Sequence, residues 1–402
     1  MYIKREIEVT IDSLLRQGKV ILVTGARQVG KTTMLQNHLG STFDYVSMEN
    51  PRDYQLAKQD SVLFFETRNF PLIIDEIQRV PELFSTVKWI VDQSSEKGRI
   101  VLTGSQTYHL MKGVSESLAG RIRILEMPAL SLRELAETNS SPKPYVPACI
   151  QPSKQVQNID IWSVIHRGSM PELQDKTVNW DSYYSDYVAA YLERDVRDLI
   201  NVKDESKFYN FMVACAARSG QLLNVSDISN AIDVDSKTVK AWLSVLQASN
   251  IVRVIEPFWP NVDKRFTKTP KLFFMDTGLV CHLTRWTTPE QLRNGAVAGH
   301  VFETFVVSEI LKSYMNAGAN LHDVWFYRDS KKHEIDLVIQ EGHILHPVEV
   351  KTSATVGINA VKNFNCLEGL PDYKVGFGHV VCQTAEPYFV TRNVQAVSVW
   401  DI

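Results

Sequence analysis

The chain has 402 residues, enough for about two to four domains, and its 44% hydrophobic and 22% charged residues are typical of a soluble globular protein. No run of about 18 apolar residues is present, the first residues lack the apolar core of a secretory signal, and the five scattered cysteines argue against a disulfide framework or a zinc site, so we expect a cytoplasmic protein without a membrane partner. The net charge of −3 gives no general attraction to nucleic acid, so any such binding must come from local basic patches.

The first motif along the chain is a phosphate-binding loop at residues 25–32. An apolar run at residues 19–23 predicts a buried strand before it, and residues 33–39 can continue as a helix after it. The glycines let backbone N–H groups face a polyphosphate, and the helix N-terminus adds partial positive charge. Lys31 would reach the β- and γ-phosphates, and the Thr32 hydroxyl would hold Mg²⁺. The expected contacts to ATP are Gly25, Ala26, Arg27, Gln28, Val29, Gly30, Lys31, Thr32 and Thr33.

Two further strands complete the predicted nucleotide site. Residues 71–76 form an apolar strand that ends in Asp75, which can hold Mg²⁺ opposite Thr32, and Glu76, which can orient and polarise the attacking water. Residues 98–106 are apolar and then abruptly polar, and parallel sheets place ligands outside the carboxyl ends of their strands. Candidates to sense the γ-phosphate are therefore Thr103, Ser105 and Gln106, although Thr-Gly-Ser is also ordinary turn chemistry.

The order of the elements predicts a multidomain α/β protein. Residues 1–136 alternate between strand and helix, which predicts a P-loop ATPase core with a parallel sheet. Residues 137–205 would be a linker or mobile loop, rich in Ser and Pro over 137–160, followed by a lid-like helical segment that includes residues 183–200. Residues 206–285 would be a winged helix, and residues 286–402 a separate α/β domain.

The predicted winged helix rests on two helices and two strands. The helices are residues 225–232 and residues 236–246, the second opening on Ser236 as a cap, and the strands are residues 251–255 and 271–275. This segment is only mildly basic, and winged helices also serve as packing modules between ATPase subunits. Side chains that could contact DNA phosphates are Lys237, Lys240, Lys264, Arg265, Lys268 and Lys271.

A second chemical signal lies in residues 286–402. Strand alternation places Asp336 on one face of the strand at residues 334–340, with Glu334, and places Glu349 with Lys351 on one face of the strand at residues 344–352. Glu303 borders the apolar stripe of a helix at residues 302–312. If the strands pair, Glu303, Asp336 and Glu349 can hold Mg²⁺ or Mn²⁺, and Lys351 can activate water. The alternative is the solvated face of a hairpin, where alternating Glu and Lys are routine.

These residues resemble two known families. The arrangement of Glu303, Asp336 and Glu349-x-Lys351 resembles the restriction-endonuclease-like nuclease core. The chain as a whole is similar to a widespread bacterial and archaeal family of AAA-type ATPases with a carboxyl-terminal domain of unknown function. That likeness rests on residues 24–32, 74–78, 102–106, 117–121, 191–197, 264–268, 275–279 and 334–336.

The resemblance implies roles for several further residues. It implies that Glu76 is the catalytic glutamate, that Ser105 and Gln106 lie near the first sensor position, and that Arg121 faces phosphate. Such ATPases usually complete their sites with an arginine from a neighbouring subunit, so it also implies a homo-oligomer. The candidates for that arginine are Arg121, Arg194 and Arg197.

Two functions follow as expectations. The first is a Mg²⁺-dependent ATPase that acts on nucleic acid and carries a nuclease-like domain that cuts or binds DNA. The second is an ATP-switched oligomeric scaffold, or a signalling ATPase, whose carboxyl-terminal domain binds without cleaving. Loss of the acids predicted to bind metal would separate the two.

Overall fold

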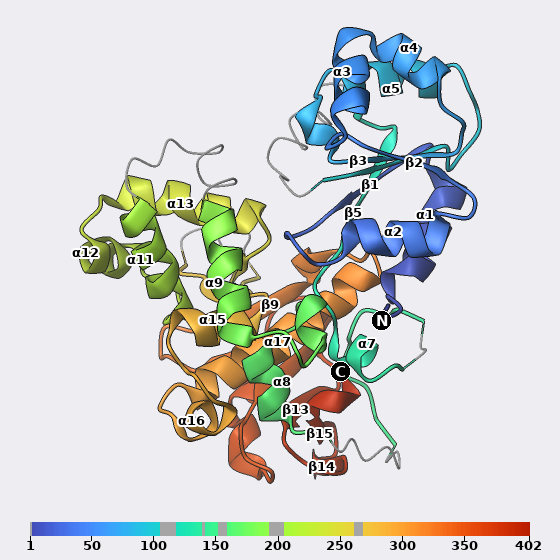
Figure 1. Ribbon diagram of the computed structural model, residues 1–402. Coiled ribbons are helices and arrows are strands. Elements are labelled where there is room, and N and C mark those ends of the chain that lie inside the picture. The colour runs from blue at the N-terminus through green and yellow to red at the C-terminus, as the bar shows by residue number, and fades with distance from the viewer. Residues whose placement is uncertain (1, 105–117, 139–140, 152–158, 193–204, 261–267) are drawn as a thin grey trace.

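The computed structural model describes residues 2–104, 118–138, 141–151, 159–192, 205–260 and 268–402 (Figure 1). Its first part is a five-stranded parallel sheet in the order β2-β3-β4-β1-β5. The strands are β1 (Val20–Thr24), β2 (Asp44–Ser47), β3 (Leu72–Asp75), β4 (Ile100–Thr103) and β5 (Ile122–Glu126). The order places β1, which precedes the phosphate-binding loop, between β4 and β5. The predicted parallel sheet is therefore confirmed.

Helices cover both faces of this sheet, as parallel strands require (Figure 1). On one face, α1 (Ile7–Gln17) and α2 (Lys31–Leu39) pack against the strand side chains that include Ile21, Val23 and Val101. On the other, α3 (Pro51–Gln59), α4 (Ser61–Glu66) and α5 (Leu83–Asp92) pack against the set that includes Leu22 and Ile74. Because successive strand residues point to opposite faces, the two cores share each central strand.

The middle of the chain is helical around a small antiparallel sheet. Its helices are α8 (Ile161–Arg167), α9 (Trp180–Tyr191), α11 (Glu205–Ala216), α12 (Val225–Ile232), α13 (Ser236–Ala248), α15 (Thr277–Leu283) and α16 (Pro289–Asn294). The strands β6 (Gln221–Leu222), β7 (Val252–Ile255) and β8 (Lys271–Phe274) pair in the order β6-β8-β7. The predicted elements are present, but the cap of α13 is Asp235, not Ser236, because the Asp235 carboxylate accepts two of the free backbone N–H groups at that end, those of Lys237 and Thr238.

The carboxyl-terminal part is a long helix packed on a mixed sheet. Helix α17 (Ala298–Asn316) precedes β9 (Val324–Arg328), β10 (Glu334–Glu341), β11 (Ile344–Val350), β12 (Lys374–Val375), β13 (Gly378–Cys382), β14 (Tyr388–Thr391) and β15 (Val394–Ser398). The order is β14-β15-β13-β11-β10-β9, with β12 also paired to β11. The predicted helix and the pairing of its two predicted strands, β10 and β11, are confirmed.

Helix α17 lies at the centre of the molecule and connects its parts. It is buried on nearly all sides from Val301 to Asn316, and it packs against α1, β5, β8, α15 and β11. Residues 137–138, 141–151 and 159–160 of the predicted linker are described, and residues 141–151 are held against the carboxyl-terminal part rather than free. The Tyr145 hydroxyl and the His379 Nδ1 atom are 2.5 Å apart, and Ile150 exchanges hydrogen bonds with Gln395. Within the described residues, no helix is long and apolar enough to cross a bilayer.

Candidate functional site

The phosphate-binding loop joins β1 to α2 in a conformation that requires glycine. Gly30 has φ of 90°, and a side chain at Gly25, where φ is 144°, would place its Cβ atom 2.3 Å from the carbonyl oxygen of Met127. Lys31 is 7% exposed, and its ammonium donates to the carbonyl oxygens of Gly25 at 3.0 Å and Ala26 at 2.7 Å. The loop thus forms the expected cradle, with its lysine directed along it.

Two oxygen atoms lie together at the carboxyl edge of the sheet. The Thr32 hydroxyl donates to Asp75 Oδ2 at 2.9 Å, which brings the two predicted Mg²⁺ ligands side by side. Oxygen donors of this kind suit Mg²⁺, so these residues fit the ion. The Tyr45 hydroxyl, from the neighbouring strand β2, also donates to Asp75 Oδ2, at 2.7 Å. Tyr45 was missed by the sequence analysis because it belongs to no motif, although β2 is the neighbour of β3 in the sheet.

Glu76 follows directly and has a strained backbone. Its φ of 54° is left-handed, a conformation that is uncommon for non-glycine residues and that costs energy. Burial, and then the nearby charge of Asp75, raise the pKa of Glu76, while Lys31 and Gln78 oppose that rise. The Gln78 side-chain amide donates to Glu76 Oε2 at 2.5 Å. A carboxylate with a raised pKa beside the loop can accept a proton from water. Gln78, which was not predicted from the sequence, holds the Glu76 carboxylate in one orientation.

The predicted γ-phosphate sensors are placed only in part. Thr103 ends β4 beside β1, where it pairs with Val23, and is fully buried. Its hydroxyl oxygen has no hydrogen-bond partner within the described residues. Ser105 and Gln106 lie outside the described residues. Thr103 is thus at the edge where a nucleotide would lie, and its hydroxyl is available.

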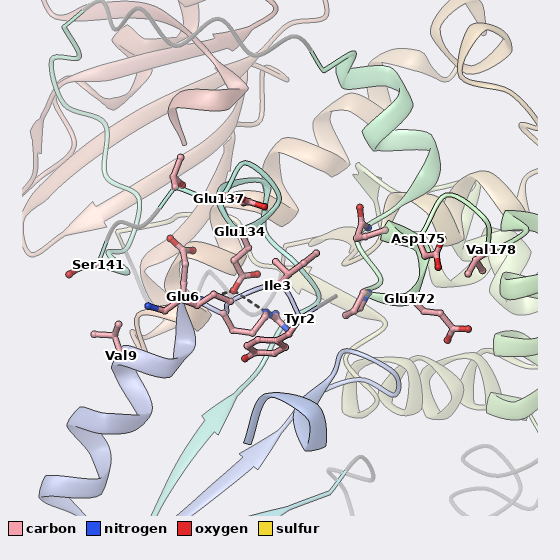
Figure 2. Close-up of a pocket in the computed structure, with 15 residues that line it drawn as sticks. Tyr2, Ile3, Glu6, Val9, Glu134, Glu137, Ser141, Glu172, Asp175 and Val178 are labelled. Atoms are coloured by element: carbon pink, nitrogen blue, oxygen red, sulfur yellow. Dashed lines mark hydrogen bonds and ion pairs between the residues drawn. The ribbon is translucent and has the colours of Figure 1, made fainter. Parts of the chain in front are cut away.

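A cavity adjoins the phosphate-binding loop. One part, of about 300 Å³, is lined by Gly30 and Thr33 together with residues from the start of the chain. It shares Tyr2, Ile3, Arg5 and Pro171 with a larger open part of about 990 Å³. Figure 2 shows the Tyr2 ring among these residues. This cavity was not predicted from the sequence, because residues from the start of the chain and from near Pro171 meet only in the folded chain.

Arg5 supports the loop from behind. It is 3% exposed, and its guanidinium donates to the Val29 carbonyl at 2.8 Å, to the Pro128 carbonyl at 2.7 Å and to the Glu134 carboxylate at 3.0 Å. The three acceptors come from the loop, from the segment after β5 and from α7 (Leu132–Leu135). Arg5 therefore fixes the loop relative to the rest of the chain, a role that no local motif indicates.

The arginines predicted to face phosphate lie elsewhere or outside the described residues. Arg121 directly precedes β5, and its exposed guanidinium pairs with Asp92 at 2.5 Å. Because Ile122 pairs with Val20 in register, Arg121 lies at the opposite edge of the sheet from the loop, about 13 Å along β1. It therefore does not face the phosphates of its own chain, and a role toward a neighbouring subunit stays a prediction. Arg194 and Arg197 lie outside the described residues.

The second cluster contains the predicted carboxylates and one unpredicted lysine. Lys271 of β8 places its ammonium 2.8 Å from Glu303 Oε1 on α17, 2.7 Å from Glu334 Oε1 and 3.9 Å from Asp336 Oδ1 on β10. The Lys271 side chain is 3% exposed. Lys271 was predicted to contact DNA phosphates, and this was wrong, because its side chain points into the protein interior. Glu334, which also pairs with Arg328, completes the group.

Charges and burial set the protonation of this cluster. Burial alone would lower the pKa of Lys271, but the charges of Glu303, Asp336 and Glu334 raise it overall. Burial, and then the charge of Asp336, raise the pKa of Glu303 to about 8. For Glu334, burial is outweighed by Lys271 and Arg328, which lower its pKa. The ammonium is therefore firmly charged among its acids.

The predicted Glu-x-Lys pair lies next to this cluster. Lys351 donates to Glu349 Oε1 at 2.6 Å, and Asp336 Oδ2 accepts from the backbone N–H of Val350 at 2.8 Å. Burial, and then the charge of Asp336, raise the pKa of Glu349 to about 7. The structure thus brings Glu303, Asp336, Glu349 and Lys351 to one region, as expected from the register of β10 and β11.

The predicted DNA contacts are only partly on the surface described. Lys237 and Lys240 are exposed on α13. Lys268 lies over the ring of Trp259, with its ammonium 4.9 Å from the ring centre. Lys264 and Arg265 lie outside the described residues. Helix α13 is therefore the described element that could present positive charge to a phosphate backbone.

Comparison with known families identifies the first part of the chain. A family model described as an AAA domain matches residues 17–136, and two others, each described as a domain of unknown function, match residues 158–290 and 298–402. Two uncharacterized proteins, from Mycobacterium bovis and Mycobacterium tuberculosis, are each 27% identical over 364 residues, which is 89% of this chain and 75% of theirs.

Several solved structures are similar to parts of this chain at low identity. A Walker-type ATPase of Pyrococcus abyssi is 14% identical, with 69% of this chain and 94% of that chain covered and a TM-score of 0.41. The RuvB Holliday junction branch migration motor of Thermotoga maritima is 15% identical, with 61% of this chain and 88% of that chain covered and a TM-score of 0.30. AMPPCP-bound DnaA from Aquifex aeolicus is 14% identical, with 60% of this chain and 85% of that chain covered and a TM-score of 0.27. These TM-scores are too low to support an inference about this chain.

The family match and the loop geometry define residues 17–136 as an AAA-type P-loop ATPase domain. The matches over the remaining residues name no activity. The winged helix, the endonuclease-like fold and the predicted domain boundaries therefore stay predictions.

Proposed function

We propose that this protein binds ATP with Mg²⁺ and hydrolyses it by attack of water on the γ-phosphate. The observation that carries the proposal is the contact between the Thr32 hydroxyl and Asp75, 2.9 Å apart beside the loop that holds Lys31. Two oxygen ligands and one ammonium at a helix N-terminus are the arrangement that P-loop ATPases use.

Each residue has a defined task in this reaction. The loop N–H groups and the Lys31 ammonium bind the phosphates and neutralise the charge that develops during transfer. Thr32 and Asp75 hold Mg²⁺, which when bound neutralises charge on the phosphate oxygens. Glu76 orients water and takes its proton, and its Gln78 contact holds the carboxylate in one direction. The cavity beside Gly30 and Thr33 receives the nucleoside.

A neighbouring copy completes the site in this proposal. Arg121 is exposed at the end of the sheet opposite its own loop and pairs there with Asp92, which supports a role toward the nucleotide of a second copy rather than its own. An arginine supplied in this way stabilises the charge of the transition state and raises the rate of hydrolysis by about 10³-fold or more. This implies that the active form is a homo-oligomer, with Arg194 and Arg197 as the other candidates.

For the rest of the chain we propose a role in binding DNA rather than cutting it. The topology around β6, β7 and β8 supports a winged helix, and the helix glutamate with two adjoining strands of acids supports an endonuclease-like fold. The ion pairs of Lys271 favour binding without cleavage, because they engage the acids that a nuclease would use for metal. The ATPase would then act as a switch for a DNA-bound assembly.

The ATPase is tested with two variants and a matched control. Lys31→Ala should lose nucleotide binding, whereas Glu76→Gln should bind ATP and lower kcat by about 10²- to 10⁴-fold, because only the proton acceptor is removed. Glu82→Gln, at an exposed glutamate near the start of α5, should turn over as the unchanged protein does. Phosphate release measures turnover, and a fluorescent ATP analogue measures binding. Normal turnover in Glu76→Gln would show that another residue activates the water.

A further inference from the structure

The ammonium of Lys271 occupies the point where three carboxylates converge. Its neighbours come from different elements, Glu303 from α17 and both Glu334 and Asp336 from β10. Two of the three nitrogen–oxygen distances, 2.8 and 2.7 Å, are those of charge-assisted hydrogen bonds. A group of acids around one buried cation is therefore already formed, and that cation belongs to the chain itself.

The backbone presents this lysine rigidly. Lys271 begins β8, the central strand of the three-stranded sheet, and it pairs with Leu222 of β6 and with Ile255 of β7. All four residues of β8 are buried. Its ammonium can leave the acids only if the side chain turns within the packed interior or if this sheet moves away from α17 and β10.

The other predicted metal ligands are also engaged. Asp336 Oδ2 accepts from the Val350 backbone N–H, and Glu349 Oε1 accepts from Lys351. Within the described residues, Glu349 Oε2 is left without a hydrogen-bond partner. A divalent ion needs several oxygen ligands at about 2.0–2.6 Å, and an ammonium at the centre of the same acids excludes it by charge and by volume. In this arrangement the residues do not fit a divalent metal.

We propose that Lys271 is the resident cation of this acidic cluster, where it keeps divalent metal out and locks the three-stranded sheet to the carboxyl-terminal domain. The cluster is thus an ionic joint between two parts of the chain. Removing the lysine leaves three partly buried carboxylates without their shared cation, and a divalent cation is a suitable partner for them. The proposed joint does not depend on ATP hydrolysis, so an experiment can contradict this proposal without contradicting the proposed ATPase activity, and the reverse.

The test is titration of the nucleotide-free full-length chain with Mn²⁺, followed by electron paramagnetic resonance of the free ion. The unchanged protein and Asp336→Asn should bind the same number of Mn²⁺ ions, because the acidic cluster holds none in either. Lys271→Met should gain one site, Lys271→Met with Asp336→Asn should lose it again, and Lys271→Arg, which keeps the positive charge, should not gain it. Lys240→Met, at an exposed lysine, is the matched control and should behave as the unchanged protein does.

Each outcome decides the proposal. A Mn²⁺ site in the unchanged protein that is lost in Asp336→Asn would overturn it, because metal would then bind despite the lysine. A folded Lys271→Met that gains no site would also overturn it, because the lysine would not be what excludes metal. If Lys271→Met does not fold, the comparison of the unchanged protein with Asp336→Asn still decides, since the absence of a difference in Mn²⁺ binding supports exclusion.

Discussion

Replacing Arg5 by methionine should destabilise the ATPase domain and loosen its phosphate-binding loop. The side chain is 3% exposed and links the Val29 carbonyl, the Pro128 carbonyl and the Glu134 carboxylate. Methionine keeps most of the apolar stem but none of the donors. The variant would therefore bury two unpaired carbonyl oxygens and one carboxylate that has lost its cation.

The loss of stability in Arg5→Met depends on the hydrogen bonds that Glu134 keeps in the variant. Removing one partner of a buried ion pair costs about 3–5 kcal/mol. Glu134 still accepts the backbone N–H of Glu6 on one carboxylate oxygen and that of Ser131 on the other, both at 2.8 Å. These two donors continue to stabilise its charge, so we expect a loss near the lower limit, about 3 kcal/mol.

Urea unfolding, followed by fluorescence and by hydrogen exchange of the loop amides, measures this loss. Arg16→Met, at an exposed arginine of α1, is the matched control and should change stability by less than about 0.5 kcal/mol. ATP binding should weaken in Arg5→Met and not in the control, because Val29 belongs to the loop. An Arg5→Met protein as stable as the control would refute the reasoning that these buried acceptors need the guanidinium.

Two further predictions concern acid pH and DNA. Burial lowers the pKa of His379 from 6.5 to about 4, so the stability it contributes is present above about pH 6.5 and is lost as the pH falls toward 4. Protection factors at residues 144–150, which divide the intrinsic exchange rate at each pH by the measured one, should therefore fall on acidification, and His379→Gln should flatten this response; protection that does not change with pH would contradict it. Lys237→Ala with Lys240→Ala should weaken DNA binding in a filter assay and reduce its salt slope by about 1–2, relative to Lys58→Ala. Unchanged affinity would exclude α13 from the interface.

The sequence was sufficient where structure depends on neighbouring residues along the chain. The loop at residues 25–32, the strand that ends at Asp75 and the helix at Val225–Ile232 follow from local patterns, and each is present with nearly the predicted bounds. Strand alternation also placed Asp336 and Glu349 correctly on facing positions, because the period of two is a property of the backbone.

The partners of these residues could not be predicted, because they lie far away in the sequence. Tyr45 reaches Asp75 from another strand, and Arg5 reaches Glu134 across 129 positions. Lys271 was predicted to contact DNA phosphates because it follows other basic residues in the sequence. Its burial depends on the packing of β8 against α17, which no local pattern contains.

Helix α17 gives the two candidate sites a common support. Near one end Glu303 contacts Lys271, and about 14 Å further along the helix Lys312 donates to the Leu130 carbonyl, while Glu309 accepts the N–H of Leu132. The segment that carries these two leucines follows β5 and closes against the loop at Gly25. A helix buried on nearly all sides cannot bend locally without opening its packing. A nucleotide-driven shift of that segment would therefore move α17 as a unit, and the joint at Lys271 would respond.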